Sequence, residues 1–244
     1  MSVDGDYVRA ADDLAERCLA KFSDSEASLD VRAFALDIVV SQLAIGNRAM
    51  LAHVPDICRT LRDFAAGTQT ITGIKAADFY RQIIAALSIL LNLPPTENHA
   101  GAWLEPVIDH FVQLVSCCGC HNVETALVAT VAWEFWAEHA DVITHWRWMR
   151  KLLAALMDQM MFDWDRMMFP WNFDDQFPTE ILSGAADGAL RSVSVSLILP
   201  HNRALYTKFR PWLETRIEWH SWREKEAAIR VLCAFTDAAG ECSV

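Results

Sequence analysis

The sequence predicts an all-α protein built from antiparallel helical hairpins. Of its 244 residues 53% are hydrophobic, whereas only 9 are glycine and 8 are proline, so long segments run without interruption. The apolar residues come in blocks rich in Ala, Leu, Ile and Met, not in the short alternating runs that are typical of strands. These blocks alternate with short breakers at a spacing that corresponds to hairpins of about 40 residues.

Each helix is predicted between two such breakers. The expected ranges are 4–22, 30–45, 54–64, 77–91, 100–116, 123–139, 143–161, 178–197, 203–217 and 222–239. Pro94, Gly119, Pro170 and Pro178 fall between blocks, where proline ends a helix and glycine permits a tight reversal. In 123–139, the stripe Leu127, Val131 and Phe135 predicts one face in a core. The hairpin period is that of HEAT-type arrays, so we expect a right-handed α-solenoid of about five HEAT-like pairs, with 1–244 as a single array.

The charge of the chain restricts its partners. Its 32 acidic and 21 basic residues give a net charge of -11, which disfavours nucleic acid and anionic lipid and favours basic partners. No apolar leader follows Met1, and no stretch reaches the roughly 18 apolar residues of a membrane span. We therefore expect a protein of the cytosol or nucleus, whose 7 cysteines are reduced thiols.

One cysteine-rich segment resembles a cofactor motif. The run Cys117-Cys118-Gly119-Cys120-His121 matches the C-x-x-C-H pattern of covalent haem attachment, and two thiolates with an imidazole are legitimate zinc ligands. Haem attachment of this kind requires export, however, and no second metal-ligand pair follows. The favoured interpretation is a small-residue turn between two helices, with no cofactor and no metal.

Two further groups of residues are candidate sites. Glu134, Glu138, His139 and His145 lack the Glu-x-x-His spacing of di-iron bundles, so solvated helix ends are favoured. A belt of Trp and Met residues is expected mainly to fill the core, with an exposed recognition surface as the alternative. The belt comprises Trp133, Trp136, Trp146, Trp148, Met149, Met157, Met160, Met161, Trp164, Met167, Met168 and Trp171. Phosphate loops and nucleophile elbows are absent from the sequence, so no enzyme is predicted.

Several landmarks together resemble one protein family. They are Glu97-Asn98-His99, the Cys-containing loop after Val115, the acidic Glu124, Trp133-Glu134-Phe135-Trp136, the acidic aromatic loop around Trp171 to Phe177, and Trp222 with Glu226-Ala227-Ala228. Their order is similar to the middle of importin-beta (karyopherin) superfamily nuclear transport receptors, closest to the branch of transportin-SR and importin thirteen. Where that family places a Phe-Arg pair after the acidic loop, this chain has Glu180-Ile181.

The resemblance implies binding of protein cargo for transport between cytoplasm and nucleus. Family members are several times longer, so the chain corresponds to a central block of HEAT repeats, either part of a longer solenoid or a shortened relative. Ran GTPase would be bound only if the N-terminal repeats exist elsewhere, and nucleoporins are further possible partners. The expected cargo is a protein with basic or Arg/Ser-rich segments.

An acidic aromatic stretch is the candidate cargo-binding site. It consists of Asp163, Trp164, Asp165, Trp171, Asp174 and Asp175. Carboxylates interleaved with indole rings bind Lys and Arg by ion pairing and cation–π contact. A solvated loop between helices is the competing interpretation of this stretch. For the whole chain, the alternative function is a helical scaffold, adaptor or regulator unrelated to nuclear transport.

Overall fold

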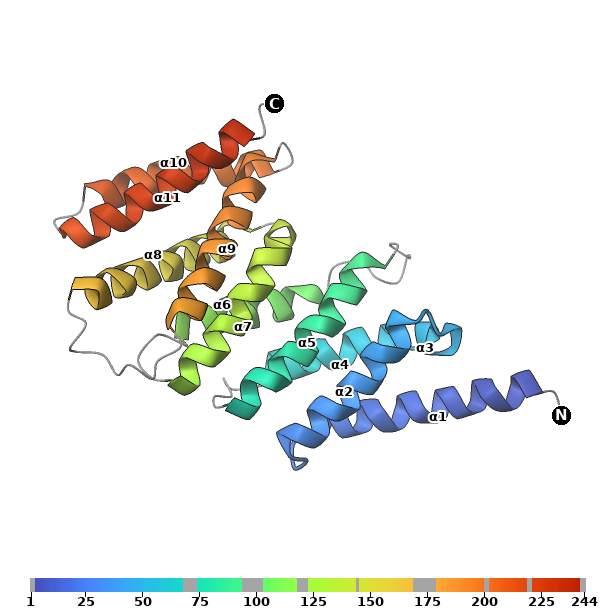
Figure 1. Cartoon of the computed structure of the whole chain (residues 1–244). Helices are drawn as coiled ribbons and strands as arrows, with labels where there is room; N and C mark the ends of the chain where they lie inside the picture. The colour runs from blue at the N-terminus through green and yellow to red at the C-terminus, as the bar shows by residue number, and fades with distance from the viewer. Residues whose placement is uncertain are drawn as a thin grey trace. The chain divides into compact units, whose positions relative to one another are not determined.

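The computed structural model describes residues 3–67, 74–93, 103–117, 123–143, 145–168, 179–199, 202–218 and 221–241. Within these ranges the chain forms α-helices and one short 3₁₀-helix and contains no strand, so the predicted all-α class is confirmed (Figure 1). The chain divides into two compact units, Met1–His110 and Phe111–Val244. Each unit is described by itself, and the expected single array stays a prediction.

The helices follow the predicted ranges closely. Their bounds are α1 Val3–Ser23, α2 Leu29–Ala44, α3 Arg48–Ala52, α4 Val54–Gly67, α5 Ile74–Asn92, α6 Leu104–Cys117, α7 Val123–His139, α8 Trp146–Met168, α9 Thr179–Ile198, α10 Arg203–Ile217 and α11 Trp222–Glu241. The 3₁₀-helix, η2, covers Ala140–Val142. Predicted and observed bounds coincide for α7 and α10. The five-residue α3 was not predicted.

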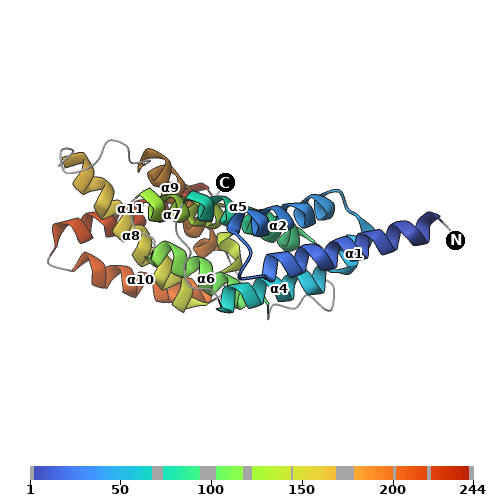
Figure 2. The same cartoon turned by 90° about the horizontal axis from the view of Figure 1, so that it is seen from below.

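The first unit consists of helices that run back and forth. α1 packs against α2 and α4, and α2 packs against α5. Figures 1 and 2 show α1 and α2 running in opposite directions, with α2 and α5 on one side of the unit and α1 and α4 on the other. The Ser28 side chain accepts the Val31 amide at the start of α2. At the end of α2, Gly46 has a φ of 69°, a left-handed conformation that favours glycine at this reversal.

Three phenylalanine rings form the centre of the first unit. Phe22, Phe64 and Phe79 come from α1, α4 and α5, and their ring centroids lie 5.4–5.8 Å apart. The Arg32 guanidinium lies 5.0–5.7 Å from the three centroids. Burial lowers the pKa of Arg32, although Asp24 and Tyr80 act in the opposite direction. Apolar contact and cation–π attraction therefore join α1, α2, α4 and α5 at one point.

The second unit is built around α7. Buried side chains cover most of the circumference of this helix, because Val128, Ala129 and Ala132 are as inaccessible as Val131 and Phe135 of the predicted stripe, whereas Leu127 is partly exposed. A helix with so wide an apolar surface is expected to lie largely in an interior. α7 packs against α9, and α9 packs in turn against α8, α10 and α11. A larger part of α7 is therefore buried than the single face that the sequence predicted.

The Trp and Met belt fills this interior where its side chains are described. Trp133, Trp136, Trp148, Met149, Met157 and Met160 are buried, which confirms the core interpretation for them. The Trp136 indole nitrogen donates to the Phe111 carbonyl at 3.4 Å, so the ring also has its polar atom satisfied. Trp146 and Met161 are partly exposed.

The last helix, α11, turns most of its apolar residues toward the second unit. Ala227 and Val231 are buried within this unit. Phe235 stacks on Tyr206 of α10, with ring centroids 5.4 Å apart. The apolar residues that α11 exposes are Trp222, Ile229 and Leu232.

Hydropathy along the described helices is too low for a membrane span. None of these helices combines the necessary length with a sufficiently apolar sequence.

Candidate functional site

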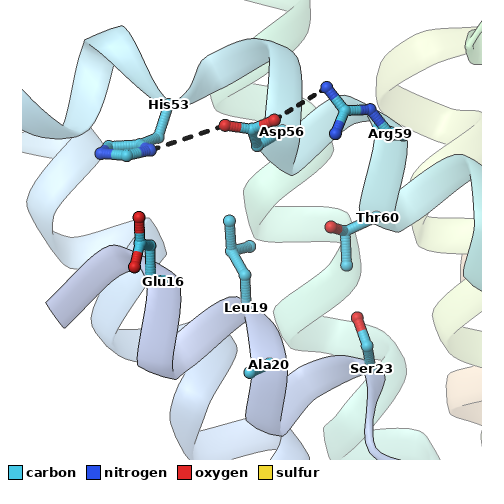
Figure 3. Close-up of a pocket in the computed structure, with 8 residues that line it drawn as sticks. All are labelled: Glu16, Leu19, Ala20, Ser23, His53, Asp56, Arg59 and Thr60. Atoms are coloured by element: carbon cyan, nitrogen blue, oxygen red, sulfur yellow. Dashed lines mark ion pairs between the residues drawn. The ribbon is translucent and has the colours of Figure 1, made fainter. Parts of the chain in front are cut away.

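A groove of about 300 Å³ lies between α1 and α4 in the first unit (Figure 3). Its lining residues are Glu16, Leu19, Ala20, Ser23, His53, Asp56, Arg59 and Thr60. α1 contributes the first four of these residues, and α4 with the turn before it contributes the rest. Two carboxylates, two hydroxyl groups, an imidazole and the Arg59 guanidinium therefore lie around one open hollow.

His53 connects the two sides of this groove. Its carbonyl accepts the amides of Asp56 and Ile57, both at 2.9 Å, so His53 stands at the N-cap position of α4. Its Nε2 lies 3.1 Å from a carboxylate oxygen of Asp12 on α1, and its Nδ1 lies 3.6 Å from Asp56. A neutral imidazole donates through one nitrogen only, whereas a protonated imidazole donates through both. His53 therefore lies between a carboxylate of α1 and a carboxylate of α4.

The remaining charges of the groove are unequally matched. Asp56 also pairs with Arg59, whose terminal nitrogen lies 2.8 Å from its carboxylate. Glu16 has no hydrogen-bond or ion-pair partner among the described residues, and Figure 3 shows its side chain on the α1 side below the His53 ring. An exposed carboxylate in this position keeps its full capacity to accept hydrogen bonds.

This arrangement suits a cationic group. An ammonium or guanidinium in the groove would find the Glu16 and Asp56 carboxylates, while the Ser23 and Thr60 hydroxyls can accept further hydrogen bonds. The methylene stem of a Lys or Arg can pack on Leu19 and Ala20. The groove is open and shallow, so it fits a protruding side chain of another protein better than an enclosed small molecule.

The cargo site predicted from sequence falls largely outside the described residues. Trp171, Asp174 and Asp175 lie in the undescribed range 169–178. Asp163, Trp164 and Asp165 have a helical backbone, because α8 continues to Met168 instead of ending near residue 161. Helical periodicity places Asp163 and Asp165 about 200° apart around the axis of α8. These three residues therefore lie within α8 and not in the loop between helices of the competing interpretation, and their side chains lie outside the described residues.

Of the two groups that resemble metal sites in the sequence, the structure describes the Glu134 group but only the first residue of the cysteine-rich segment. Cys118, Gly119, Cys120 and His121 lie outside the described residues, and Cys117 is the last residue of α6. Glu134 and Glu138 are exposed on α7, while His139 lies 3.7 Å from the Glu138 carboxylate. Burial lowers the pKa of His139. Among the described side chains, no three His, Cys, Asp or Glu residues are positioned to share a metal ion.

Comparison with known proteins adds no assignment: the chain matches no family model and no curated protein.

The α1–α4 groove was not predicted from the sequence. Asp12 and His53 are 41 positions apart, and no periodicity connects them. The available signal was the acidic start of α1, where Asp12, Asp13 and Glu16 occur within five residues. That cluster indicated a polar helix face, but the structure was needed to place α4 against it.

Proposed function

We propose that this chain is a HEAT-like helical array that binds basic segments of partner proteins, as a segment of an importin-type nuclear transport receptor would. The acidic groove with the partnerless Glu16 is the observation that carries the binding proposal. The right-handed solenoid and the nuclear transport role rest on the sequence landmarks. Its partners would then be proteins with basic or Arg/Ser-rich segments, met in the cytoplasm and the nucleus.

The packing inside each unit supports a hairpin array. In the first unit, α1 packs on α4 and α2 packs on α5, so equivalent helices of consecutive pairs are neighbours. In the second unit, α8 packs on α10, while α7 and α11 both pack on α9. Contacts of this kind are expected where each helix pair covers the next, as in solenoid proteins.

The charge of the chain supports a basic partner. A net charge of -11 attracts cationic segments over roughly a Debye length, which is about 8 Å at physiological ionic strength. Long-range attraction alone would not select a binding position. The groove adds a local position, because Glu16 and Asp56 face the same hollow from two helices.

Isothermal titration calorimetry with an Arg/Ser-rich peptide tests the proposal on the full chain. The variant Glu16→Gln/Asp56→Asn removes one partnerless carboxylate and one that pairs with an arginine. We expect it to weaken binding about three- to tenfold per carboxylate. The matched control is Glu26→Gln/Asp63→Asn in the same unit, since Glu26 has no described side-chain partner and Asp63 pairs with Arg62.

The control changes the net charge by the same amount and should keep the parent affinity within about twofold, an energy difference of less than 0.5 kcal/mol. Equal weakening in both variants would show that only net charge matters and would remove the groove from the proposal. Failure of every basic peptide to bind would remove the transport-receptor function and favour the scaffold or regulator alternative.

A separate variant tests the acidic aromatic stretch. Replacing Asp163, Asp165, Asp174 and Asp175 together by Asn should weaken the same peptide if this stretch contributes to cargo binding. Ion pairs and cation–π contacts with Trp164 and Trp171 are the physical reason. An unchanged affinity would eliminate the stretch as a site and leave the groove as the candidate.

A further inference from the structure

A second cavity, of about 460 Å³, lies at the N-terminal end of α8 in the second unit. It is lined by His145, Trp146, Arg147, Arg150, Lys151 and Lys208. Four of the 21 Lys and Arg residues of the chain therefore border one cavity, although the chain as a whole carries a net charge of -11. No carboxylate is among the described residues that line it.

Three of these cations belong to α8, and their spacing is unfavourable for a helix. Arg147, Arg150 and Lys151 are spaced i, i+3 and i+4, which places them on one face of α8, where like charges repel one another. No Asp or Glu occurs three or four positions from any of these residues or from Lys208. Five arginines of other helices show the opposite pattern. Intrahelical acidic partners at these spacings accompany Arg17, Arg59, Arg81, Arg210 and Arg230.

The helix terminus adds positive potential to the same cavity. The His145 carbonyl accepts the amides of Trp148 and Met149 at 3.1 and 3.2 Å, so α8 begins at this point. The first amides of a helix have no intrahelical acceptor, and the helix dipole places partial positive charge there. Three cationic side chains near the start of α8 therefore line one hollow, and α10 contributes Lys208.

Two tryptophans complete this region. Trp146 packs edge-to-face on Trp212 of α10, with centroids 6.3 Å apart. The Trp212 indole nitrogen is buried and has no hydrogen-bond partner among the described residues. A buried donor without a partner destabilises the folded state. Trp146 lines the cavity, whereas Trp212 does not, so this donor is not one of the groups that form the site.

We propose that this cavity binds a small, multiply phosphorylated ligand. Arg and Lys side chains with helix N-terminal amides are the groups that recognise phosphate oxygens. The volume lies in the range of about 300–1,000 Å³ that is typical of small-molecule sites. An extended nucleic acid would instead need a continuous basic track, and the net charge of -11 would repel it.

Calorimetry with inorganic tripolyphosphate on the full chain, at 50 and 150 mM salt, tests this site. The variant Arg147→Gln/Arg150→Gln/Lys151→Gln/Lys208→Gln should weaken binding at least tenfold. The control Arg17→Gln/Arg62→Gln/Lys75→Gln/Arg81→Gln removes four exposed cations of the first unit that pair with acids. It should change the affinity less than twofold.

Several outcomes would overturn the site. They are equal weakening in both variants, no binding of tripolyphosphate at millimolar concentration in 50 mM salt, or tighter binding of a Glu-rich peptide than of tripolyphosphate. If circular dichroism shows that the fourfold variant is unfolded, Lys208→Gln is compared with Lys75→Gln. A loss of about threefold in the former alone would support the site, and equal affinities would overturn it.

Discussion

The Arg32 side chain donates a hydrogen bond from Nε to the backbone carbonyl of Phe22 at 2.8 Å, across the interior of the first unit. Phe22 is the penultimate residue of α1, so no backbone amide of this helix can donate a hydrogen bond to its carbonyl. A buried arginine thereby satisfies the end of a neighbouring helix. The same guanidinium faces the phenylalanine rings of α1, α4 and α5.

Arg32→Lys should therefore destabilise the protein. Lysine keeps the positive charge but loses the planar guanidinium that stacks on the rings, so we expect the free energy of unfolding to fall by about 1–3 kcal/mol. Urea denaturation measures this change. The control Arg62→Lys, at a partly exposed position beside Asp63, should stay within about 0.5 kcal/mol. Equal effects of the two substitutions would contradict the structural role of Arg32.

Acidic pH should destabilise the first unit through His110. Burial lowers the pKa of this residue to about 4, and its Nε2 lies 3.2 Å from the Tyr80 hydroxyl. The unfolded chain binds the proton more readily, with an ordinary pKa of about 6.5. Stability is thus fully present above pH 6.5 and falls as the pH drops toward 4, by at most about 3 kcal/mol.

Unfolding free energies of the parent and of His110→Gln, compared between pH 7 and pH 4, check this linkage. The difference between the two proteins removes the contribution of His139, whose pKa is also lowered by burial. The variant should show the shallower decline. Parallel pH profiles would mean that His110 does not titrate as its burial implies.

The cysteines should differ sharply in reactivity. Burial raises the pKa of Cys58 to about 11 and also raises the pKa of Cys18, whereas Cys233 is exposed. Because the thiolate is the nucleophile, iodoacetamide at pH 8 should alkylate Cys233 roughly a hundredfold faster than Cys58. Peptide mass spectrometry resolves the sites. In urea the two rates should converge, and a fast native Cys58 would contradict its burial.

Two glycines of α9 should respond in opposite ways to larger side chains. A Cβ at Gly184 would meet nothing within 4 Å, so Gly184→Ala should stabilise the helix by about 1 kcal/mol. A Cβ at Gly188 would lie 3.4 Å from the Ala137 Cβ on α7. Gly188→Leu should therefore cost about 1–3 kcal/mol through overpacking. Thermal denaturation of both variants measures these changes in stability. If Gly184→Leu is as destabilising as Gly188→Leu, the expected difference between the two positions is wrong.

Local signals in the sequence predicted most helices, but not every boundary. α7 and α10 were predicted with their observed bounds, because polar or glycine-containing segments interrupt the apolar pattern at their ends. The end of α8 was placed too early. Between Met161 and Met168 no proline or glycine occurs, so the helix continues through Asp163 and Asp165 despite their charge. The unpredicted α3 has only five residues, too few to show a period.

The sites could not be predicted in the same way because they depend on contacts between distant segments. The α1–α4 groove requires Asp12 to lie beside His53, and the cationic cavity requires Lys208 to lie beside the start of α8. The three cations of α8 share a face that helical spacing alone identifies. The overall acidity of the chain predicts basic partners, and this local cationic face is an exception to it.

The close approach of Gly188 to Ala137 also predicts how this fold can change over evolution. The two positions occupy one shared space between α7 and α9, so a larger residue at one should be accepted only where the other stays small. In divergent chains of the same architecture, substitutions at these positions should therefore be correlated. Such a coupled pair could reveal a common ancestor where overall sequence identity has been lost.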